Sequence, residues 1–203
     1  GTFDPSTAGP GTHEVIYTIS GSCGAADTIY IAVEAMPDAT ITPVGPFCSN
    51  DPSVTLVAAD TGGVWSGTGV SSGGIFDPSA AGAGTHQIIY TISGTCTDAD
   101  TISITVVQAA DATITPAGPY CISDAPEILT AVDTGGTWSG TGVNPTTGEF
   151  DPSAAGDGTH EIVYTISGTC GDADTIYILV YTQADASITA SGPFCDQDSV
   201  FTL

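Results

Sequence analysis

Hydrophobic and polar residues alternate along the longest patterned segments of this chain. In the run 85–92, the residues at positions 86, 88, 90 and 92 fall on one face. In the run 101–106, Ile102, Ile104 and Val106 share a face in the same way. A period of two is that of a half-buried β-strand, and no helix of any length is expected. Shorter strands are predicted at 40–43, 54–58, 64–66 and 74–76.

The pattern belongs to an internal repeat. Phe3-Asp4-Pro5-Ser6 recurs at 76–79 and 150–153, and the Trp-containing block 61–70 recurs at 134–143. The offsets are 73 (76 − 3) and 74 (150 − 76) residues, and such self-similarity is the signature of a repeat architecture. The predicted parts are the C-terminal part of a repeat (1–37), two full repeats (38–110 and 111–184) and the N-terminal part of another (185–203).

About seven short strands in each repeat indicate an all-β fold of tandem immunoglobulin-like β-sandwich repeats, each of about 73 residues. Trp65 and Trp138 lie where such a sandwich keeps a buried core tryptophan. Tyr90 and Tyr164 lie on the long penultimate strand, where a tyrosine corner is expected. These four aromatic side chains are predicted to be structural.

The order of short motifs resembles a known family. Along the first full repeat the chain reads Pro-Phe-Cys, Val-Thr-Leu, Trp-Ser-Gly-Thr-Gly, Phe-Asp-Pro-Ser-Ala-Ala-Gly, Gly-Thr-His-x-Ile-x-Tyr and Gly-Thr-Cys. This order is similar to that of tandem immunoglobulin-like repeats in giant surface adhesins and filament proteins of Bacteroidetes-type bacteria. The resemblance covers the whole chain and implies export, a bacterial cell-surface location and a stalk or adhesive role.

Charge excludes several classes of partner. The chain has no Lys or Arg and 23 Asp plus Glu, for a formal net charge of −23. Nucleic-acid binding needs cations to release phosphate counterions, and anionic lipid surfaces would repel this chain. No apolar run is long enough to span a membrane. The chain has no signal-peptide pattern either, and we expect it to be part of a longer protein.

Six cysteines recur at one pair per full repeat: Cys23, Cys48, Cys96, Cys121, Cys170 and Cys195. Without a Cys-x₂-Cys knuckle they indicate disulfides rather than zinc. Pairing within a repeat, pairing of Cys48 with Cys170 across a junction, and pairing in chain order all remain open at this point. Within-repeat pairing meets a difficulty, because a sandwich of this kind places its two loops at opposite ends.

The acidic residues suggest calcium. Without cations, carboxylates are left solvated or are neutralised by metal ions, and clustered oxygen ligands suit Ca²⁺. We predict a collar of Ca²⁺ ligands at the repeat junction, with solvated loop acids as the alternative. Its candidate ligands are Asp51, Asp77, Asp111, Asp133, Asp172 and Asp174.

Nothing in the chain indicates an enzyme. The histidines at 13, 86 and 160 each stand alone in their repeat, and no nucleophile elbow is present. Thr28, Thr101 and Thr175 follow Asp and precede Ile, which resembles the short acceptor for O-glycans in Bacteroidetes-type bacteria. The expected partners are neighbouring repeats, identical chains in a filament, and an external surface or glycan.

Two functions follow from this reasoning. The first is a structural segment of an exported fibre or adhesin stalk, stiffened by disulfides and by Ca²⁺. The second is a multivalent carbohydrate- or surface-binding module with one weak site per repeat.

Overall fold

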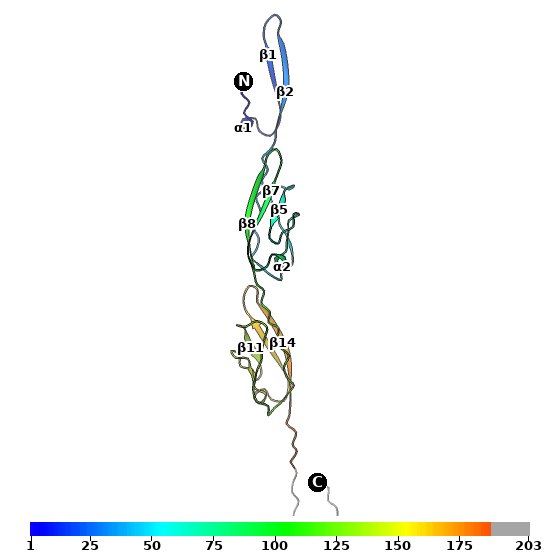
Figure 1. Cartoon of the computed structure of the whole chain (residues 1–203), viewed down its shortest axis with the longest axis vertical. Coiled ribbons are helices and arrows are strands. Elements are labelled where there is room, and N and C mark those ends of the chain that lie inside the picture. The colour runs from blue at the N-terminus through cyan, green and yellow to red at the C-terminus, as the bar shows by residue number, and fades with distance from the viewer. Residues whose placement is uncertain (188–203) are drawn as a thin grey trace, which may run out of the picture. The chain divides into compact units, whose positions relative to one another are not determined.

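A computed structural model describes residues 1–187 of the chain (Figure 1). By its contacts the chain divides into two compact units, Gly1–Ala109 and Ala110–Leu203. The first unit contains a β-hairpin and one complete sandwich, and the second contains another complete sandwich.

The N-terminal hairpin consists of β1 (Gly11–Ile19) and β2 (Ala25–Val33), preceded by the short helix α1 (Pro5–Ala8). The strands are antiparallel, with Gly11 opposite Val33, and they are the blue strands of Figure 1. One face of the hairpin carries Tyr17 and Ile19, which are 71% and 54% exposed. Tyr90, the residue equivalent to Tyr17 in the first full repeat, is only 3% exposed. The face of this hairpin that corresponds to the buried face of the full repeat is therefore exposed in residues 1–37.

The larger layer of the first full repeat is a four-stranded sheet in the order β3-β8-β7-β5. Its strands are β3 (Phe47–Cys48), β5 (Val64–Gly67), β7 (Gly84–Ile92) and β8 (Asp98–Val107). Strand β7 pairs with both β5 and β8 antiparallel, whereas β3 pairs with β8 in parallel. This parallel pairing was not predicted from the sequence.

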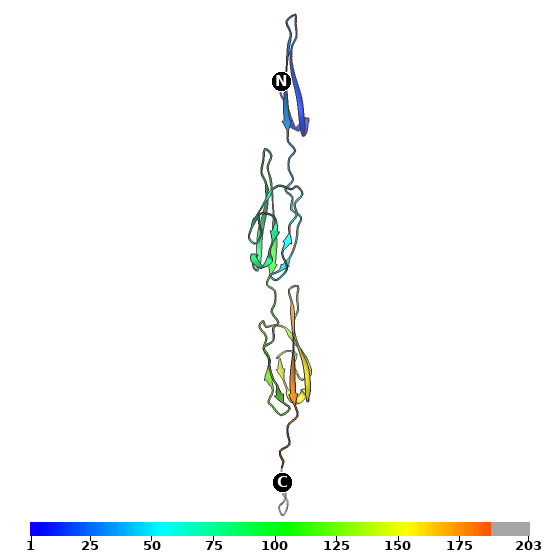
Figure 2. The same cartoon turned by 90° about the vertical axis from the view of Figure 1, so that its right-hand side faces the viewer.

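The smaller layer of the same repeat is formed by β4 (Val54–Thr55) and β6 (Ile75–Phe76) together with the segment around Ile41. That segment was predicted as a strand at 40–43, and it makes an isolated bridge between Ile41 and Ala58. Figure 2 shows the short cyan strands of this layer opposite the green strands of the larger sheet. Two layers facing each other make a β-sandwich.

The second full repeat has the same construction. Its strands β9 (Tyr120–Cys121), β11 (Thr137–Gly140), β13 (Gly158–Ile166) and β14 (Asp172–Tyr181) form a four-stranded sheet in the order β11-β13-β14-β9. Strands β10 (Glu127–Ile128) and β12 (Glu149–Phe150) form the smaller sheet, and Ile114 bridges to Ala131. The prediction of all-β tandem immunoglobulin-like sandwiches is confirmed.

Each full repeat closes its own apolar core. In the first, Phe76, Ile88 and Ile104 are fully buried, and the rings of Trp65 and Tyr90 are 4.5 Å apart between centroids. The second core contains the equivalent residues, with Trp138 and Tyr164 also 4.5 Å apart. The inward residues are those that the alternation of β7 and β8 predicted, because successive side chains of a strand point to opposite faces.

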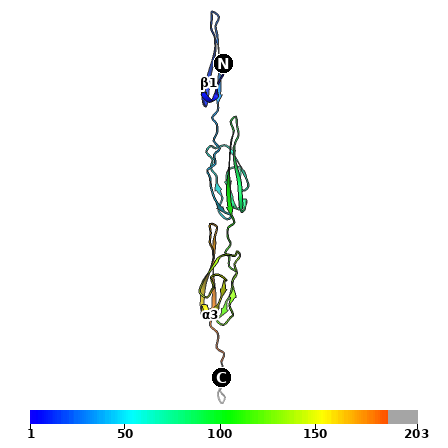
Figure 3. The same cartoon turned by 90° about the vertical axis from the view of Figure 1, so that its left-hand side faces the viewer.

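Three one-turn helices were not predicted: α1, α2 (Pro78–Ala81) and α3 (Pro152–Ala155), the last labelled in Figure 3. In α2, the Asp77 side chain caps the backbone N–H groups of Ser79 and Ala80, and Pro78 occupies the first turn. The turn ends at Gly82, whose φ of 75° lies in the left-handed region. An Asp cap, an early Pro and a terminal Gly form a helix signal that strand periodicity alone overlooks.

Candidate functional site

A carboxylate clamp binds the first extended segment of each full repeat. In the first repeat it consists of Asp38, Asp60, Asp98 and Asp100. Oδ2 of Asp98 accepts from the Ala39 N–H at 2.8 Å, and Oδ2 of Asp100 accepts from the Ile41 N–H at 2.8 Å.

The other two members of this clamp bind the N–H groups of residues 38 and 40. Oδ2 of Asp60 accepts from the Asp38 N–H at 2.8 Å, and Oδ1 of Asp38 accepts from the Thr40 N–H at 2.9 Å. Four consecutive N–H groups, those of residues 38–41, thus donate to carboxylates instead of to a neighbouring strand. These are charge-assisted hydrogen bonds, which neutralise part of each carboxylate without any cation.

The second repeat repeats the clamp with four residues that the sequence suggested as calcium ligands: Asp111, Asp133, Asp172 and Asp174. Oδ2 of Asp172 accepts from the Ala112 N–H at 2.9 Å, and Oδ2 of Asp174 accepts from the Ile114 N–H at 2.8 Å. Asp133 and Asp111 accept from the N–H groups of residues 111 and 113 at 2.9 and 3.0 Å. The structure therefore brings these four acids to one end of the repeat, where they bind backbone.

The remaining two calcium candidates have local structural partners. Oδ2 of Asp51 accepts from the Cys48 N–H at 2.7 Å and so closes the turn that follows β3. Asp77 caps α2, where Oδ1 accepts from the Ser79 N–H at 2.9 Å and from the Ser79 hydroxyl at 2.7 Å. Among residues 1–187, no group of three or more His, Cys, Asp or Glu side chains is placed to hold a metal ion. Calcium binding stays a prediction.

Hydrogen bonds also set the proton affinity of several acids. The hydroxyl of Ser79 and the N–H of Ala80 hold the pKa of Asp77 below its usual 3.8, because both stabilise the anion. The side chain and backbone of Thr40 lower the pKa of Asp38 in the same way. In the second repeat, burial and a hydrogen bond to Glu127 raise the pKa of Tyr120 to about 12.

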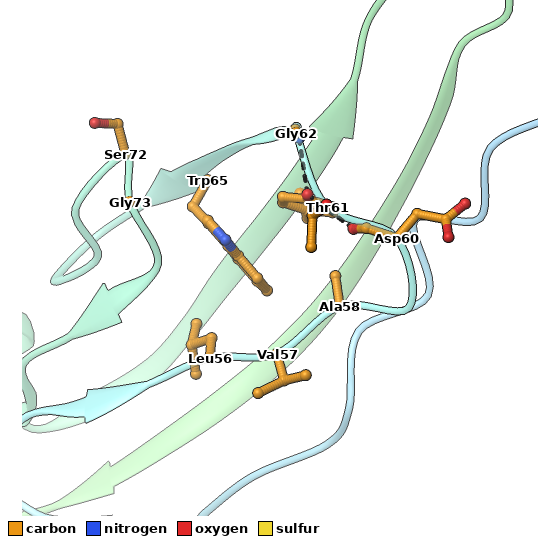
Figure 4. A pocket seen from close by; sticks show the side chains of 11 residues that line it. Leu56, Val57, Ala58, Asp60, Thr61, Gly62, Trp65, Ser72 and Gly73 are labelled. Carbon is orange, nitrogen blue, oxygen red and sulfur yellow. Dashed lines mark hydrogen bonds between the residues drawn. The ribbon is translucent and has the colours of Figure 1, made fainter.

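A tyrosine corner lies beside the core tryptophan. The Tyr90 hydroxyl donates to the Asp60 carbonyl oxygen at 3.0 Å and accepts from the Gly63 N–H at 2.8 Å, as the dashed lines of Figure 4 show. Gly63 is required by this close approach, since a Cβ there would lie 2.6 Å from Cζ of Tyr90. The equivalent Tyr164 donates to the Asp133 carbonyl at 3.1 Å.

A small pocket opens over each corner. The pocket of the first repeat has a volume of about 290 Å³ and is lined by Asp60, Thr61 and Trp65 among others (Figure 4). Its counterpart in the second repeat has a volume of about 280 Å³. Trp65 is only 8% exposed, so the pocket offers a ligand little of the indole surface.

The histidines are structural. Nε2 of His86 lies 2.8 Å from the carbonyl oxygen of Gly82, the residue that ends α2. A carbonyl oxygen only accepts, so Nε2 carries the proton and donates it. His13 and His160 make the same bond to Gly9 and Gly156. Each histidine thus ties its one-turn helix to the start of the long strand.

The cysteines have two chemical states. Cys48 and Cys170 are disulfide-bonded. Cys23, Cys96 and Cys121 are free, and Cys195 lies outside the described residues. Pairing within repeats requires Cys96 and Cys121 to be bonded, as does pairing in chain order. The free state of both cysteines therefore contradicts these two alternatives.

The surface carries the three threonines that the sequence suggested as O-glycan acceptors. Thr28, Thr101 and Thr175 are all exposed, as such an acceptor must be. Tyr177 and Tyr181 on β14 are 66% and 52% exposed and face away from the core. No helix of the described part of the chain is long and apolar enough to cross a membrane.

Comparison with known proteins gives structural neighbours only. No protein-family description matches the sequence, and no curated protein matches it. Solved structures that match include the EC3-6 cis-dimer of protocadherin gammaB7, at 14% identity and a TM-score of 0.36, over 85% of this chain and 57% of that one. Another is mouse cadherin-23 EC22-24, at 14% identity and a TM-score of 0.29, over 85% and 74%. A third is the insect immune protein hemolin, at 9% identity and a TM-score of 0.40, over 84% and 56%.

These neighbours are extracellular β-sandwich proteins, and at such identities the likeness concerns the fold alone. This chain spans 57% of the protocadherin gammaB7 chain and 46% of a protocadherin gamma B2 chain. The resemblance to adhesins of Bacteroidetes-type bacteria has no counterpart among these comparisons and stays a prediction.

Proposed function

We propose that this chain is a structural segment of an exported cell-surface fibre or adhesin stalk. The observation that carries the proposal is the construction of the two full repeats, which close equivalent cores in the same register. A repeat that buries its own core is a unit that can be added in series to lengthen a fibre. The disulfide-bonded Cys48 and Cys170 support an oxidising compartment such as the cell exterior.

The clamp supports the same function. Ten acids named above as clamp, cap or turn residues accept hydrogen bonds from backbone N–H groups, which stabilise their negative charge without any cation. The carboxylates left exposed keep the repeats negatively charged and mutually soluble. A display segment that carries many copies of one domain benefits from this property.

Single-molecule force spectroscopy tests the proposal. The chain is pulled from its two ends in a reducing buffer, so that no disulfide limits its extension. Each full repeat of about 73 residues is expected to release about 220 Å, from about 250 Å of extended chain less a folded length of about 33 Å. Two unfolding events of similar length and force support a mechanical array. Smooth extension without events contradicts it.

A second candidate function is the multivalent glycan-binding module. The observation that favours it is the recurrence of the pocket at Trp65 and Trp138 in both full repeats. Sugar sites usually present an aromatic face, however, and these indoles are buried. Thr134 lines the second pocket as Thr61 lines the first. Binding of the chain to a panel of immobilised polysaccharides, compared with binding of a Thr61→Ala and Thr134→Ala double variant, distinguishes the two functions. Retention that the double variant loses would favour the glycan module.

A further inference from the structure

We propose that the outer face of the second full repeat binds a neutral glycan through two exposed tyrosines of β14, Tyr177 and Tyr181. We call this surface the tyrosine platform; it consists of Tyr177, Leu179 and Tyr181 on β14 with Thr159 and Glu161 on β13. The platform lies on the sheet and is distinct from the pockets at the core tryptophans. It goes beyond the stalk function, because it gives one repeat a surface that recognises sugar.

The alternation of β14 separates the platform from the core. Ile178 and Val180 point inward and are 0% and 2% exposed. The alternate residues point outward, where Tyr177 is 66%, Leu179 36% and Tyr181 52% exposed. The core of the repeat is therefore filled without the three apolar side chains of the platform.

The first full repeat shows that the fold does not require tyrosines at these places. Ser103 and Val107 stand on β8 where Tyr177 and Tyr181 stand on β14, and both are exposed. The long strands of the two repeats pair in the same register, so the positions correspond exactly one to one. The exposed tyrosine pair is thus a property of the second repeat and not of the sandwich.

The platform combines apolar rings with hydrogen-bonding groups. Four residues separate Tyr177 from Tyr181, which places their Cα atoms about 13 Å apart along the strand, the length of a short oligosaccharide. Glu161 lies opposite Tyr177 on β13, and the Tyr177 hydroxyl donates to Oε2 of Glu161 at 3.4 Å. Thr159 lies opposite Leu179 and is exposed. The phenol rings offer apolar faces to the C–H groups of sugar rings, while the carboxylate and the threonine hydroxyl bind sugar hydroxyls.

Charge selects the class of glycan. The chain has a formal net charge of −23 and no Lys or Arg, and Glu161 places a carboxylate within the platform itself. An anionic polysaccharide would be repelled by this field and would find no cation to bind. A neutral glycan meets no such repulsion, and its hydroxyls donate to the carboxylate.

The size of the platform argues against a protein as the ligand. An aromatic side chain buries about 150–250 Å², so three apolar side chains supply at most about 750 Å². A stable protein interface buries roughly 800 Å² on each partner. Two copies of a chain with a charge of −23 also repel each other. A short stretch of neutral glycan needs neither the larger area nor a positive charge.

Retention on polysaccharides tests the platform. The probes are insoluble cellulose, chitin and mannan, with cross-linked polygalacturonic acid as the anionic comparison, and depletion of the chain from solution measures binding. We expect retention on at least one neutral probe and none on polygalacturonic acid. No retention on any neutral probe, or stronger retention on the anionic one, would overturn the proposal.

Matched variants locate the site. Tyr177→Ser combined with Tyr181→Val gives the second repeat the residues of the first. This change should weaken binding by about 10-fold or more, because truncation of an aromatic anchor commonly costs a factor of about five or more. Tyr30→Ser removes a tyrosine of the hairpin that is 69% exposed, and it should leave binding unchanged. Equal binding by the unchanged chain and the Tyr177→Ser, Tyr181→Val variant would contradict the platform.

Three controls separate the alternatives. Urea midpoints should show that the Tyr177→Ser, Tyr181→Val variant stays folded, since both side chains are exposed. In sedimentation velocity, a dimer that this variant loses would show that the platform joins copies of the chain and would overturn the proposal. The Thr61→Ala, Thr134→Ala variant should bind as the unchanged chain does, and loss of binding would assign the sugar to the pockets instead. Force spectroscopy reports on the stalk function alone, so the two proposals can fail separately.

Discussion

The Tyr90 hydroxyl provides a sharp test of how the repeat is held together. Replacing Tyr90 with Phe removes one oxygen atom and leaves the ring in place against Trp65, at a centroid distance of 4.5 Å. The change deletes the bond to the Asp60 carbonyl at 3.0 Å and the bond from the Gly63 N–H at 2.8 Å. Because apolar burial is unchanged, the effect isolates these two hydrogen bonds.

The expected cost follows from the number of bonds. A net 0.5–1.5 kcal/mol for each hydrogen bond gives a loss of about 1–3 kcal/mol in the free energy of unfolding of the first full repeat. The unfolding equilibrium constant should then rise by roughly 5- to 150-fold. For a domain of this size the melting temperature should fall by about 4–8 °C per kcal/mol.

The assay uses the single tryptophan of each full repeat. In a Trp138→Phe background, Trp65 fluorescence reports only on the first full repeat during urea unfolding in reducing buffer. The control is Tyr17→Phe, at the equivalent position of the N-terminal hairpin, where the side chain is 71% exposed. This control should change stability by less than about 0.5 kcal/mol. Equal effects of the two substitutions would refute the role of the corner.

Three further predictions concern the acids and the hairpin. Asp77→Ala should destabilise its repeat at neutral pH, and the difference should shrink as the pH falls below 3.8. The pKa of Asp77 is depressed in the folded repeat, so the stabilisation is present above the usual pKa and is lost as the carboxylate protonates; urea midpoints across pH measure this. Asp100→Ala should cost about 1–3 kcal/mol by releasing the first strand, whereas Asp27→Ala, its hairpin equivalent, should cost little; a similar loss in both would contradict the clamp. Backbone amides of 11–33 should exchange with solvent faster than those of 84–107, by hydrogen exchange; equal protection would show that the hairpin has another cover.

The sequence predicted most of the sandwich, because alternation has a direct geometric meaning. Ile88, Tyr90 and Ile104 alternate with polar residues, and each lies in the core. Because the two full repeats are related by a constant offset in the sequence, each strand and core residue assigned in the first could be assigned in the second. The parallel strand β3 escaped prediction, since a two-residue strand has too few positions for a period to show.

The acids show where the sequence argument was incomplete. Asp98 and Asp100 stand two residues apart on β8, so the same alternation that predicted the core also placed both carboxylates on the inner face. In the second repeat the equivalent acids were read as metal ligands because clustered carboxylates without cations invite a metal ion. These carboxylates can also be stabilised by backbone N–H groups, if a nearby strand has N–H groups that are not hydrogen-bonded to another strand. That strand is visible only once the fold is known.

Cysteine pairing could not be derived from the spacing of the cysteines in the sequence, because it depends on their distance in space, which is set by the length and register of the strands. Cys48 and Cys96 belong to the same repeat, but the length of β8 separates them. Their separation follows from the parallel register of Cys48 with Val107, which the sequence did not predict.

The carboxylate clamp also closes a route to misassembly. The N–H groups of Ala39 and Ile41 point away from the segment that pairs with their own strand, and left open they would template the strand of another molecule. Because both N–H groups donate to Asp98 and Asp100, neither is available to another strand at this edge. The two carboxylates also place negative charge beside it. Identical domains held at very high local concentration can therefore stay separate, each folded on itself, instead of merging edge to edge.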